Sequence, residues 1–431
     1  MTSSLVIAVL SLCSVASYDG WSFLRGPTTR ATGFFRVEKL NGRWRAVDPM
    51  GRGFRPMGCD HVSFLGITCE ALGYAPYHMH CKKTYPSDRE WMDETESRLK
   101  SWGFNLLGNG AYNEKMKGRG FVYMRGASVS GKMCQAPDAD PDLYIVRGRC
   151  PGSYLPNMFS PRYVGLCDEQ ARRNCAKSKD DPWLFGYYID NELAWWCRGT
   201  LEEGLFDEVM KKHPTHSARI ALDAFVNDRP ITRRLKIEFL YFAARKYFEG
   251  ACAAIRRHDP NHLILGCRFA GLGGAHDVVW KAAGEFCDVV SFNCYPYADL
   301  THGVVLEKEN GRPLAEVIKE MESKVGKPVY ITEWSFLGLD TEKPCKFGAG
   351  QRLASQKDRA KAVELFLTTM IETGCCIGWN YFMWVDLPTL GTWKKNGEDG
   401  NYGLVREDGR PYEEVTAVFR RIQRGGCNND D

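Results

Sequence analysis

The feature that most constrains the fold is a repeated alternation of short apolar runs with amphipathic stretches. Strands that are buried on both faces read as continuous apolar runs, as they do in parallel sheets covered by helices. Eight such runs lie at 58–61, 103–109, 120–125, 183–190, 263–268, 288–295, 328–334 and 377–386. We therefore expect an α/β fold, a (β/α)8 TIM barrel, rather than an open doubly wound sheet.

Helical periodicity separates many of these runs. Apolar residues three or four positions apart predict helices at 91–102, 161–179, 231–257, 314–324, 356–373 and 411–423. Before the first run, residues 34–47 alternate in polarity around Asn41-Gly42, which predicts a small N-terminal β-hairpin. The long stretch 128–157 is rich in Gly, Pro, Asp and Cys and is predicted to be a loop.

The chain is expected to form one barrel domain with short extensions. The apolar run at 5–16 is too short to span a bilayer and has the length of a signal-peptide core. We therefore predict a signal peptide at 1–17, an N-terminal extension with the hairpin at 18–53, the catalytic barrel at 54–424 and a polar tail at 425–431. The corresponding location is periplasmic or extracellular. No later run reaches the 18 apolar residues of a membrane span, so membrane insertion is not expected.

Charge and nucleotide motifs exclude several classes of partner. The net charge of +4 is spread over 57 basic and 53 acidic residues, which gives no nucleic-acid signature. No G-x-G-x-x-G or G-x-x-x-x-G-K-[ST] motif follows an apolar run, so nucleotide-binding classes are not favoured either.

The 17 cysteines are scattered and form no C-x-x-C pair. Several lie inside apolar runs, where a free cysteine behaves as a small apolar side chain. If the chain is exported, disulfides among Cys134, Cys150, Cys167 and Cys175 are plausible, with the pairing left open. The spacing of a structural zinc site is absent, and no metal is expected.

Two glutamates end apolar runs on opposite sides of the predicted barrel. Glu192 follows the fourth run and Glu333 ends the seventh. Reacting groups of TIM barrels lie at the carboxyl ends of the strands. Hydrolysis of a glycosidic bond needs one carboxylic acid that protonates the departing oxygen and one carboxylate that attacks or activates water. The two glutamates are therefore the predicted catalytic residues.

Aromatic residues cluster after the same strands. Trp195 and Trp196 follow Glu192, Trp334 follows Glu333, and Tyr295 and Trp384 end other runs. Aromatic faces stack on the apolar side of a pyranose ring, which lets a protein hold an uncharged sugar. Core packing is the alternative role for such residues. We predict that these five side chains contact a carbohydrate substrate.

The chain resembles a known clan at these motifs. The D-N-E step at 190–192 and the I-T-E-W segment at 331–334 are similar to those of retaining (β/α)8 glycoside hydrolases, which include β-galactosidases, cellulases, β-mannanases and β-agarases. The segments at 34–62 and 181–196 are most similar to β-agarase-like members. The resemblance extends over about 34–423, nearly the whole expected mature chain.

The resemblance implies a role for each glutamate. Glu192 would be the general acid/base and Glu333 the nucleophile of a double displacement that retains anomeric configuration. Glu192 would then need a raised pKa, whereas Glu333 would need to stay ionised. A retaining pair places its carboxyl groups about 5–5.5 Å apart. No cofactor is expected.

The resemblance also implies substrate contacts. Asn191 would bind the sugar 2-hydroxyl, Tyr295 would orient the nucleophile, and Trp384 would form the floor under the non-reducing sugar. His61 and Asn109, after the first and second strands, are further candidates for substrate hydroxyls. The predicted substrate is an oligo- or polysaccharide, with galactan or agarose favoured only by the resemblance.

Three alternatives were considered. The barrel could bind carbohydrate without catalysis, or it could be a metal-dependent hydrolase that uses His78 and His80. A thiol enzyme built from Cys59 and the neighbouring Asp60-His61 is disfavoured, because adjacent residues on a strand point to opposite faces and do not supply the facing pair that such chemistry needs. The sequence leaves open the sugar, its linkage, endo or exo action and the oligomeric state.

Overall fold

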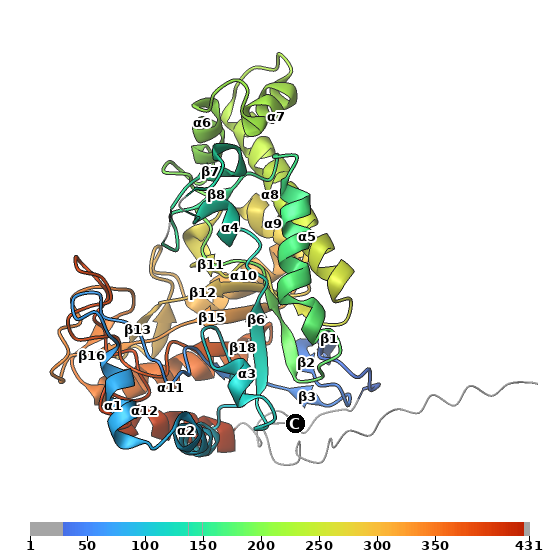
Figure 1. Cartoon of the computed structure of the whole chain (residues 1–431). Helices are drawn as coiled ribbons and strands as arrows, with labels where there is room; N and C mark the ends of the chain where they lie inside the picture. Colours follow the sequence, from blue (N-terminus) through green and yellow to red (C-terminus); the bar gives the residue numbers. More distant parts are fainter. Residues whose placement is uncertain (1–28, 137, 149, 426–431) are drawn as a thin grey trace, which may run out of the picture.

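The computed structural model describes residues 29–136, 138–148 and 150–425 (Figure 1). Its centre is a curled parallel sheet that supplies the eight strands of a barrel. In chain order these are β4 (Met57–Cys59), β5 (Leu106–Leu107), β6 (Val122–Gly126), β9 (Leu184–Tyr188), β10 with β11 (Leu263–Ile264 and Phe269–Ala270), β12 (Val290–Asn293), β15 (Val329–Glu333) and β18 (Cys376–Tyr381). The predicted TIM barrel is confirmed.

The fifth strand closes the barrel in two pieces. The sheet order is β10-β9-β6-β5-β4-β18-β15-β12-β11, so β10 pairs with the fourth strand and β11 with the sixth. Between them, Gly266 has φ 82° and Arg268 has φ 47°. Left-handed backbone at these two positions bends the fifth strand away from β9 and toward β12. Both edge strands of the sheet thereby have a hydrogen-bonding partner.

Helices surround the barrel and match the predicted ones within a few residues. They are α2 (Asp88–Trp102), α3 (Asn113–Met116), α5 (Tyr163–Asn174), α8 (Arg233–His258), α9 (Asp277–Phe286), α10 (Leu314–Val325), α11 (Gln356–Thr373) and α12 (Glu413–Gly425). The short α3 and α9 were not predicted. Helix α9 has only ten residues and packs between α8 and α10.

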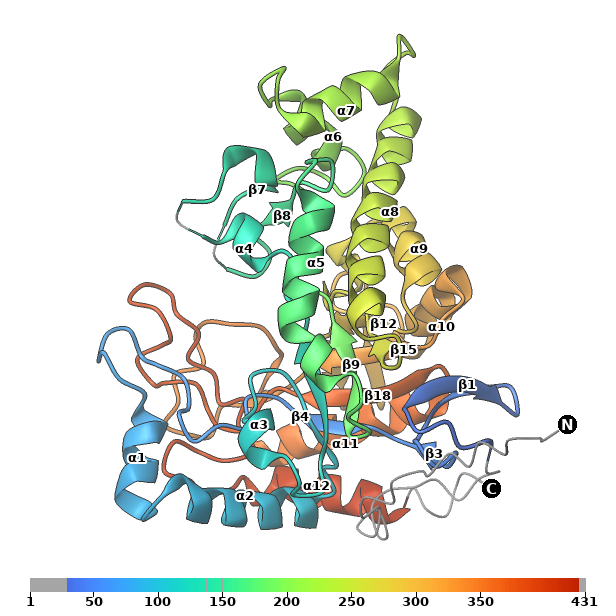
Figure 2. The same ribbon diagram turned by 45° about the vertical axis from the view of Figure 1, so that its right-hand side comes forward.

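The N-terminal hairpin covers the amino end of the barrel. Strands β1 (Arg36–Leu40) and β2 (Arg43–Val47) join through a two-residue turn, and β3 (Gly53–Phe54) adds to β2. Phe35, which directly precedes β1, forms one cluster with Ala46 and Phe54 of the sheet and with interior barrel residues. The cluster seals the lower end of the barrel and leaves the carboxyl ends of the strands for a site. Figures 1 and 2 show this small sheet beside the strand starts.

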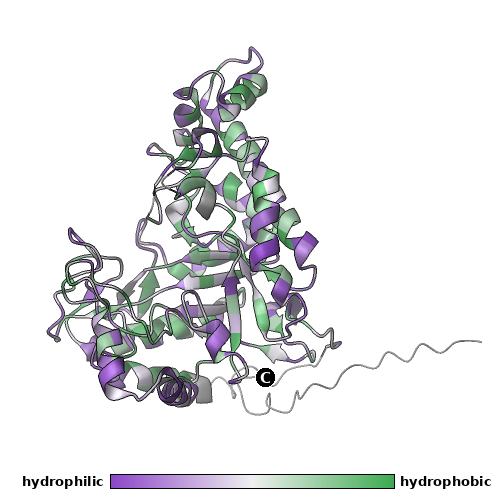
Figure 3. Cartoon of the chain, in the orientation of Figure 1, coloured by the Kyte–Doolittle hydropathy of each residue, from purple (hydrophilic) through white to green (hydrophobic). Residues whose placement is uncertain are grey.

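Hydropathy follows this layered arrangement. In Figure 3 hydrophobic residues gather along the strands and the inner faces of the helices, while hydrophilic residues mark the outer faces. The largest of the three buried clusters lies between the strands and the helices and contains Trp280, Trp334, Trp379 and Trp384. Two apolar layers, one inside the barrel and one around it, therefore support the sheet from both faces.

Further elements extend the loops. They are α1 (Pro76–Thr84), α4 (Gly131–Cys134), α6 (Gly204–Met210), α7 (Ser217–Val226), the pairs β7 (Tyr144–Val146) with β8 (Leu155–Pro156), β13 (Tyr297–Asp299) with β14 (Val304–Leu306) and β16 (Leu337–Gly338) with β17 (Arg352–Leu353), and 3-10 turns at Pro141–Leu143, Ala176–Ser178 and Leu272–Gly274. The predicted loop at 128–157 thus contains a helical turn and a small hairpin. Figures 1 and 2 show α6 and α7 at the far end of α8, beyond the barrel.

Some predictions concern the chain ends. The signal peptide at 1–17 lies outside the described residues, as do the start of the 18–53 extension and nearly all of the 425–431 tail, so these boundaries and the exported location stay predictions. Within the described ranges, no helix combines the length and apolar character needed to cross a bilayer.

The seal at the amino end yields a stability prediction. Phe54 is 2% exposed, and its ring centroid lies 5.1 Å from that of Phe35 and 6.3 Å from that of Phe185. We expect Phe54→Ala to lower the free energy of unfolding by about 3–5 kcal/mol, because the cavity left behind cannot refill. Urea denaturation measures this change. Ile220→Ala, at a side chain 55% exposed on α7, is the control and should stay within about 0.5 kcal/mol. Equal effects of the two substitutions would contradict the packing described.

Candidate active site

Both predicted catalytic glutamates line one cavity at the carboxyl end of the barrel. Glu192 follows β9, and Glu333 is the last residue of β15. The cavity has a volume of about 990 Å³ and receives side chains from loops after most of the barrel strands. Its size and place are those of a ligand site in a TIM barrel.

The backbone fixes Glu192 in an uncommon conformation. Its φ is 50°, in the left-handed region that residues other than glycine seldom adopt. Its N–H donates to the Arg268 carbonyl at 3.0 Å, and its own carbonyl accepts from the Gly152 N–H at 2.7 Å. Such conformations are found mainly where the surroundings hold a functional side chain in place.

Asn293 joins the environments of the two glutamates. Its amide nitrogen donates to Glu192 Oε1 at 2.7 Å and to Asn191 Oδ1 at 3.2 Å, and its amide oxygen accepts from the Thr332 hydroxyl at 2.9 Å. On the sheet, Asn293 lies beside Glu333 in the register of β12 and β15. One side chain therefore links the tip of the fourth strand to the tip of the seventh.

Glu333 is held by two donors. The Arg268 guanidinium binds Oε1, and the Tyr295 hydroxyl donates to Oε2 at 2.9 Å. The Glu333 side chain is 12% exposed, so it is largely enclosed yet reaches the cavity. Both carboxylate oxygens thus have a partner, and the plane of the group is fixed.

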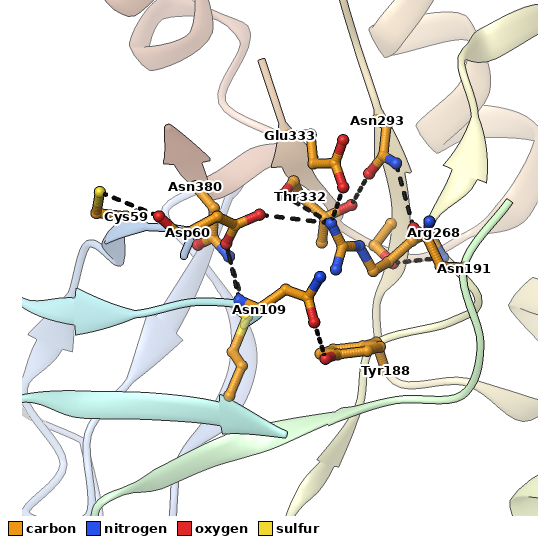
Figure 4. Close-up of polar contacts among 12 residues, drawn as sticks. Cys59, Asp60, Asn109, Tyr188, Asn191, Arg268, Asn293, Thr332, Glu333 and Asn380 are labelled. Atoms are coloured by element: carbon orange, nitrogen blue, oxygen red, sulfur yellow. Dashed lines mark hydrogen bonds and ion pairs between the residues drawn. The ribbon is translucent and has the colours of Figure 1, made fainter. Parts of the chain in front are cut away.

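A second buried carboxylate shares the guanidinium (Figure 4). Asp60, directly after β4, lies with Oδ2 3.4 Å from Arg268 Nη2. Its Oδ1 accepts from the Asn109 backbone N–H at 2.8 Å and from the Asn380 amide at 2.9 Å. Arg268 is only 1% exposed, so its charge depends on these two acids for compensation.

Burial dominates the protonation of this cluster. It raises the pKa of Glu333 to about 8; Arg268 and Tyr295 lower that pKa, whereas the charges of Glu192 and Asp60 raise it. Burial likewise raises the pKa of Asp60 to about 7, against the lowering effect of Arg268. Burial therefore opposes the ionised form that the resemblance implies for Glu333, because the loss of hydration outweighs its donors.

The other predicted polar residues meet at the same cavity. His61, Asn109, Asn191 and Tyr295 all line it. The Asn109 side chain accepts a hydrogen bond from the Tyr188 hydroxyl, and the Asn191 carbonyl accepts from the Tyr154 hydroxyl at 2.9 Å. Burial, followed by the charge of Arg268, lowers the pKa of His61 to about 4, so its imidazole is neutral at physiological pH.

Three of the predicted sugar-binding tryptophans lie in the core. Trp195, Trp334 and Trp384 are 0%, 0% and 1% exposed. The Trp384 indole donates to the Tyr77 hydroxyl at 2.9 Å, and the ring of Trp334 stacks on Phe366 at 4.0 Å. The prediction that these three contact sugar is wrong.

The reason is strand geometry. Consecutive side chains of a strand point to opposite faces. Trp334 directly follows Glu333, so when Glu333 faces the cavity, Trp334 faces the surrounding helices. Trp196 is half-buried beside Gly152 and is not among the residues that line the cavity.

Sequence reasoning missed several residues of the site. Asp60, Arg268 and Asn293 lie within two residues of the ends of predicted strands, so the rule that points to Glu192, Glu333, His61 and Asn109 also applies to them. Trp393 and Glu398 also line the cavity, but they lie in the long loop after β18, where no periodic pattern points to a site.

The metal-dependent alternative has little support. His78 and His80 lie on helix α1 and not in a loop; His78 Nδ1 is 3.2 Å from the Phe64 carbonyl, and His80 Nε2 is 3.3 Å from the Thr84 hydroxyl. Among the described residues, no three His, Cys, Asp or Glu side chains are grouped as metal ligands would be.

The cysteines of the described ranges are all free. Cys134, Cys167 and Cys175 are buried thiols, and Cys150 is exposed at the cavity, so none of the four considered for disulfides pairs with another. Burial raises the pKa of Cys59, which keeps this thiol protonated beside Asp60 and leaves the thiol-enzyme alternative without a nucleophile.

Two known proteins are similar in sequence to this chain. It is 26% identical to β-agarase B of Vibrio sp. (strain JT0107) over an alignment of 502 residues, gaps included. This alignment covers 94% of this chain and 49% of the relative. It is 24% identical to β-agarase A of the same strain over 480 residues, covering 92% of this chain and 46% of the relative. The chain resembles β-agarases. It spans about half the length of these relatives, and no family model matches it.

A solved structure supports the fold. The crystal structure of an agarase, AgWH50C, superimposes with a TM-score of 0.77 at 24% identity, covering 94% of this chain and 65% of that one. At this level of identity the likeness establishes the barrel, while the roles of individual residues depend on the site itself.

Proposed function

We propose that the chain is a retaining β-glycoside hydrolase in which Glu333 is the nucleophile and Glu192 the general acid/base. The observation that carries this proposal is the arrangement of the two glutamates. They line one cavity, Asn293 bonds Glu192 from the strand position beside Glu333, and Arg268 with Tyr295 orients the Glu333 carboxylate.

The reaction proceeds in two displacements. In the first, an oxygen of ionised Glu333 attacks the anomeric carbon while Glu192 gives its proton to the departing glycosidic oxygen, which forms a glycosyl ester on Glu333. In the second, Glu192 accepts a proton from water, the water oxygen attacks the anomeric carbon, and the ester bond breaks to restore the Glu333 carboxylate. Two inversions give net retention, and no oxidant or cofactor is consumed.

The surrounding residues differ in what they contribute. Arg268 supplies a fixed positive charge that favours ionised Glu333, and the Tyr295 hydroxyl fixes the second oxygen. Asn293 donates to Glu192 Oε1 and so leaves the other oxygen of Glu192 for the proton that is transferred. Asn191 and His61 line the same cavity as the two glutamates and are proposed to bind substrate hydroxyls.

The proposed substrate is a galactan of the agarose type. Support comes from the similarity to two β-agarases over more than nine-tenths of this chain. A cavity of about 990 Å³ holds more than a single sugar ring, which fits an oligo- or polysaccharide.

Substitution of each glutamate by glutamine tests the proposal. We expect Glu192→Gln and Glu333→Gln each to lower kcat on agarose or an aryl β-galactoside by about 10³-fold or more, because each removes an essential step. Glu372→Gln, at an exposed glutamate on α11, is the matched control and should keep the parental rate. Near-parental turnover by either active-site variant, with its fold intact, would remove that residue from the mechanism.

The same panel separates the alternatives. Saccharide binding by the parental protein without turnover on any β-glycan would favour a non-catalytic barrel. Stoichiometric zinc after exhaustive dialysis, with activity lost on chelation, would favour the metal-dependent hydrolase.

The raised pKa of Glu333 predicts the pH dependence. Because the nucleophile must be ionised, kcat/KM should fall about tenfold per pH unit as the pH decreases below about 8. Tyr295→Phe removes a donor that lowers this pKa, so its acid limb should move to higher pH. The control is Tyr402→Phe, because the Tyr402 hydroxyl donates to the Ala349 carbonyl at 2.6 Å and not to Glu333. This variant should leave the acid limb of the pH profile unchanged. An acid limb near 4.5 in the parental enzyme, or an unshifted limb in Tyr295→Phe, would contradict this account.

A further inference from the structure

One tryptophan at the cavity is exposed and has no aromatic neighbour. Trp393 lies in the loop between β18 and α12, lines the cavity and is 57% exposed. No other aromatic ring within the described residues packs against it, although most large aromatic side chains of the chain are buried. An exposed indole at a concave surface is a characteristic binding face, because it offers a large apolar area that water covers poorly.

The loop holds Trp393 rigidly. The Glu70 backbone N–H donates to the Thr392 carbonyl at 3.2 Å, and Glu70 Oε2 accepts from the Lys394 N–H at 2.9 Å, so the residues on both sides of Trp393 are bound. The Thr392 N–H donates to the Glu398 carbonyl at 3.1 Å, which closes the loop on itself. A preformed loop loses little conformational entropy when a ligand binds.

Glycine is required where this loop closes. A Cβ at Gly397 would lie 2.1 Å from the Trp393 backbone nitrogen, and one at Gly391 would lie 2.7 Å from the Gly397 carbonyl oxygen at a φ of 84°. The two segments therefore approach more closely than side chains allow. Trp393 is therefore exposed in a loop whose conformation is fixed by this close backbone approach and by the hydrogen bonds on either side of the indole.

Polar groups of the same loop face the cavity beside the indole. Glu398 lines the cavity, and its carboxylate makes no hydrogen bond or ion pair with the residues that the structure describes. Glu192 lines the same cavity, and burial, followed by the charges of Glu192 and Asp399, raises the pKa of Glu398. Asn396 also lines the cavity and adopts a left-handed φ of 54°. An apolar face next to unpaired acceptors and donors matches the chemistry of a sugar ring.

The charge of the cavity wall restricts the kind of sugar. The lining includes the glutamates Glu70, Glu192, Glu307, Glu309, Glu333 and Glu398 and the lysine Lys308. Glu70, Lys308 and Glu309 are exposed, whereas the other four glutamates are at least partly buried. A sulfate or carboxylate on a ring that reaches those four would meet acidic side chains, where repulsion is screened less than at the surface.

We propose that Trp393, Asn396 and Glu398 form a subsite that binds one neutral sugar ring of the substrate chain, beside the catalytic pair. The inference rests on the proposed function, since it assumes a saccharide in this cavity. The indole supplies the stacking face, and Asn396 and Glu398 bind ring hydroxyls. Glu70 is a positioning residue that acts through the backbone on either side of the indole.

Binding to the full chain carrying Glu333→Gln tests this subsite without hydrolysis. Titration calorimetry with agarose-derived oligosaccharides of four, six and eight units gives the dissociation constants. Adding Trp393→Ala should weaken the binding of the longest oligosaccharide that the parent holds by about 10-fold, whereas Trp393→Phe should weaken it less, because a flat face remains. Leu390→Ala is the matched control, since Leu390 is 62% exposed in the same loop and is not among the cavity-lining residues.

Charge is tested with a sulfated probe. The Glu333→Gln chain should bind a chemically sulfated octasaccharide at least about 10-fold more weakly than the unsulfated one. Adding Glu398→Gln should reduce this difference, whereas adding Glu372→Gln, outside the cavity, should not.

The outcomes distinguish this inference from the proposed function. If oligosaccharides bind and Trp393→Ala is as tight as Leu390→Ala, the subsite is wrong while the hydrolase proposal stands. Equal affinity for the sulfated and unsulfated probes would overturn the restriction to a neutral ring. If the Glu333→Gln chain binds none of the oligosaccharides while parental turnover on agarose is also absent, the agarose-type substrate fails and the subsite fails with it.

Discussion

One buried guanidinium connects three strand ends of this barrel. Arg268 lies at the break in the fifth strand; its carbonyl accepts from the Glu192 N–H, and its side chain binds Glu333 and Asp60. A buried charge is costly unless it is compensated, and removing one partner of such a group costs about 3–5 kcal/mol. The ion pair that compensates Arg268 orients Glu333, and the backbone carbonyl of the same residue holds Glu192. The closure of the barrel and the geometry of the site therefore depend on one residue.

Stability and chemistry are divided between the two ends of the barrel. The N-terminal sheet fills the amino end with Phe35 and Phe54, where packing is tight and no titratable group is needed. The carboxyl end instead collects acids, amides and left-handed backbone, which are unfavourable for folding. This division is typical of TIM barrels, where loops vary at one face while the other supports the fold.

The fold could be predicted from the sequence because buried parallel strands leave a local signal. The run at 328–334 contains β15, and the predicted helix at 356–373 coincides with α11. The short helices α3 and α9 were missed because ten residues or fewer give little periodicity. The hairpin turn at Asn41-Gly42 was predicted correctly, since its left-handed backbone demands those residue types.

The site was only partly predictable. Glu192 and Glu333 could be predicted as site residues because they lie at strand ends. Whether a tryptophan is buried or lines the cavity depends instead on the direction of its side chain beyond the strand end. Trp384 and Trp393 are nine residues apart; the first is buried against Tyr77, and the second faces the cavity. No local pattern separates them. Likewise, the raised pKa of Glu333 arises from burial and from the charges of Glu192 and Asp60, which together outweigh the lowering effect of Arg268. All of these residues are distant from Glu333 in sequence.

The central claim is that Glu333 forms a covalent bond to the sugar. An activated 2-deoxy-2-fluoro derivative of the best substrate slows the second displacement, so the glycosyl ester accumulates and can be located by peptide mass spectrometry. We predict one fluorosugar per chain on Glu333, no label in Glu333→Gln, and recovery of activity as the ester is hydrolysed. Label on another residue, or a product released with inverted anomeric configuration, would contradict it.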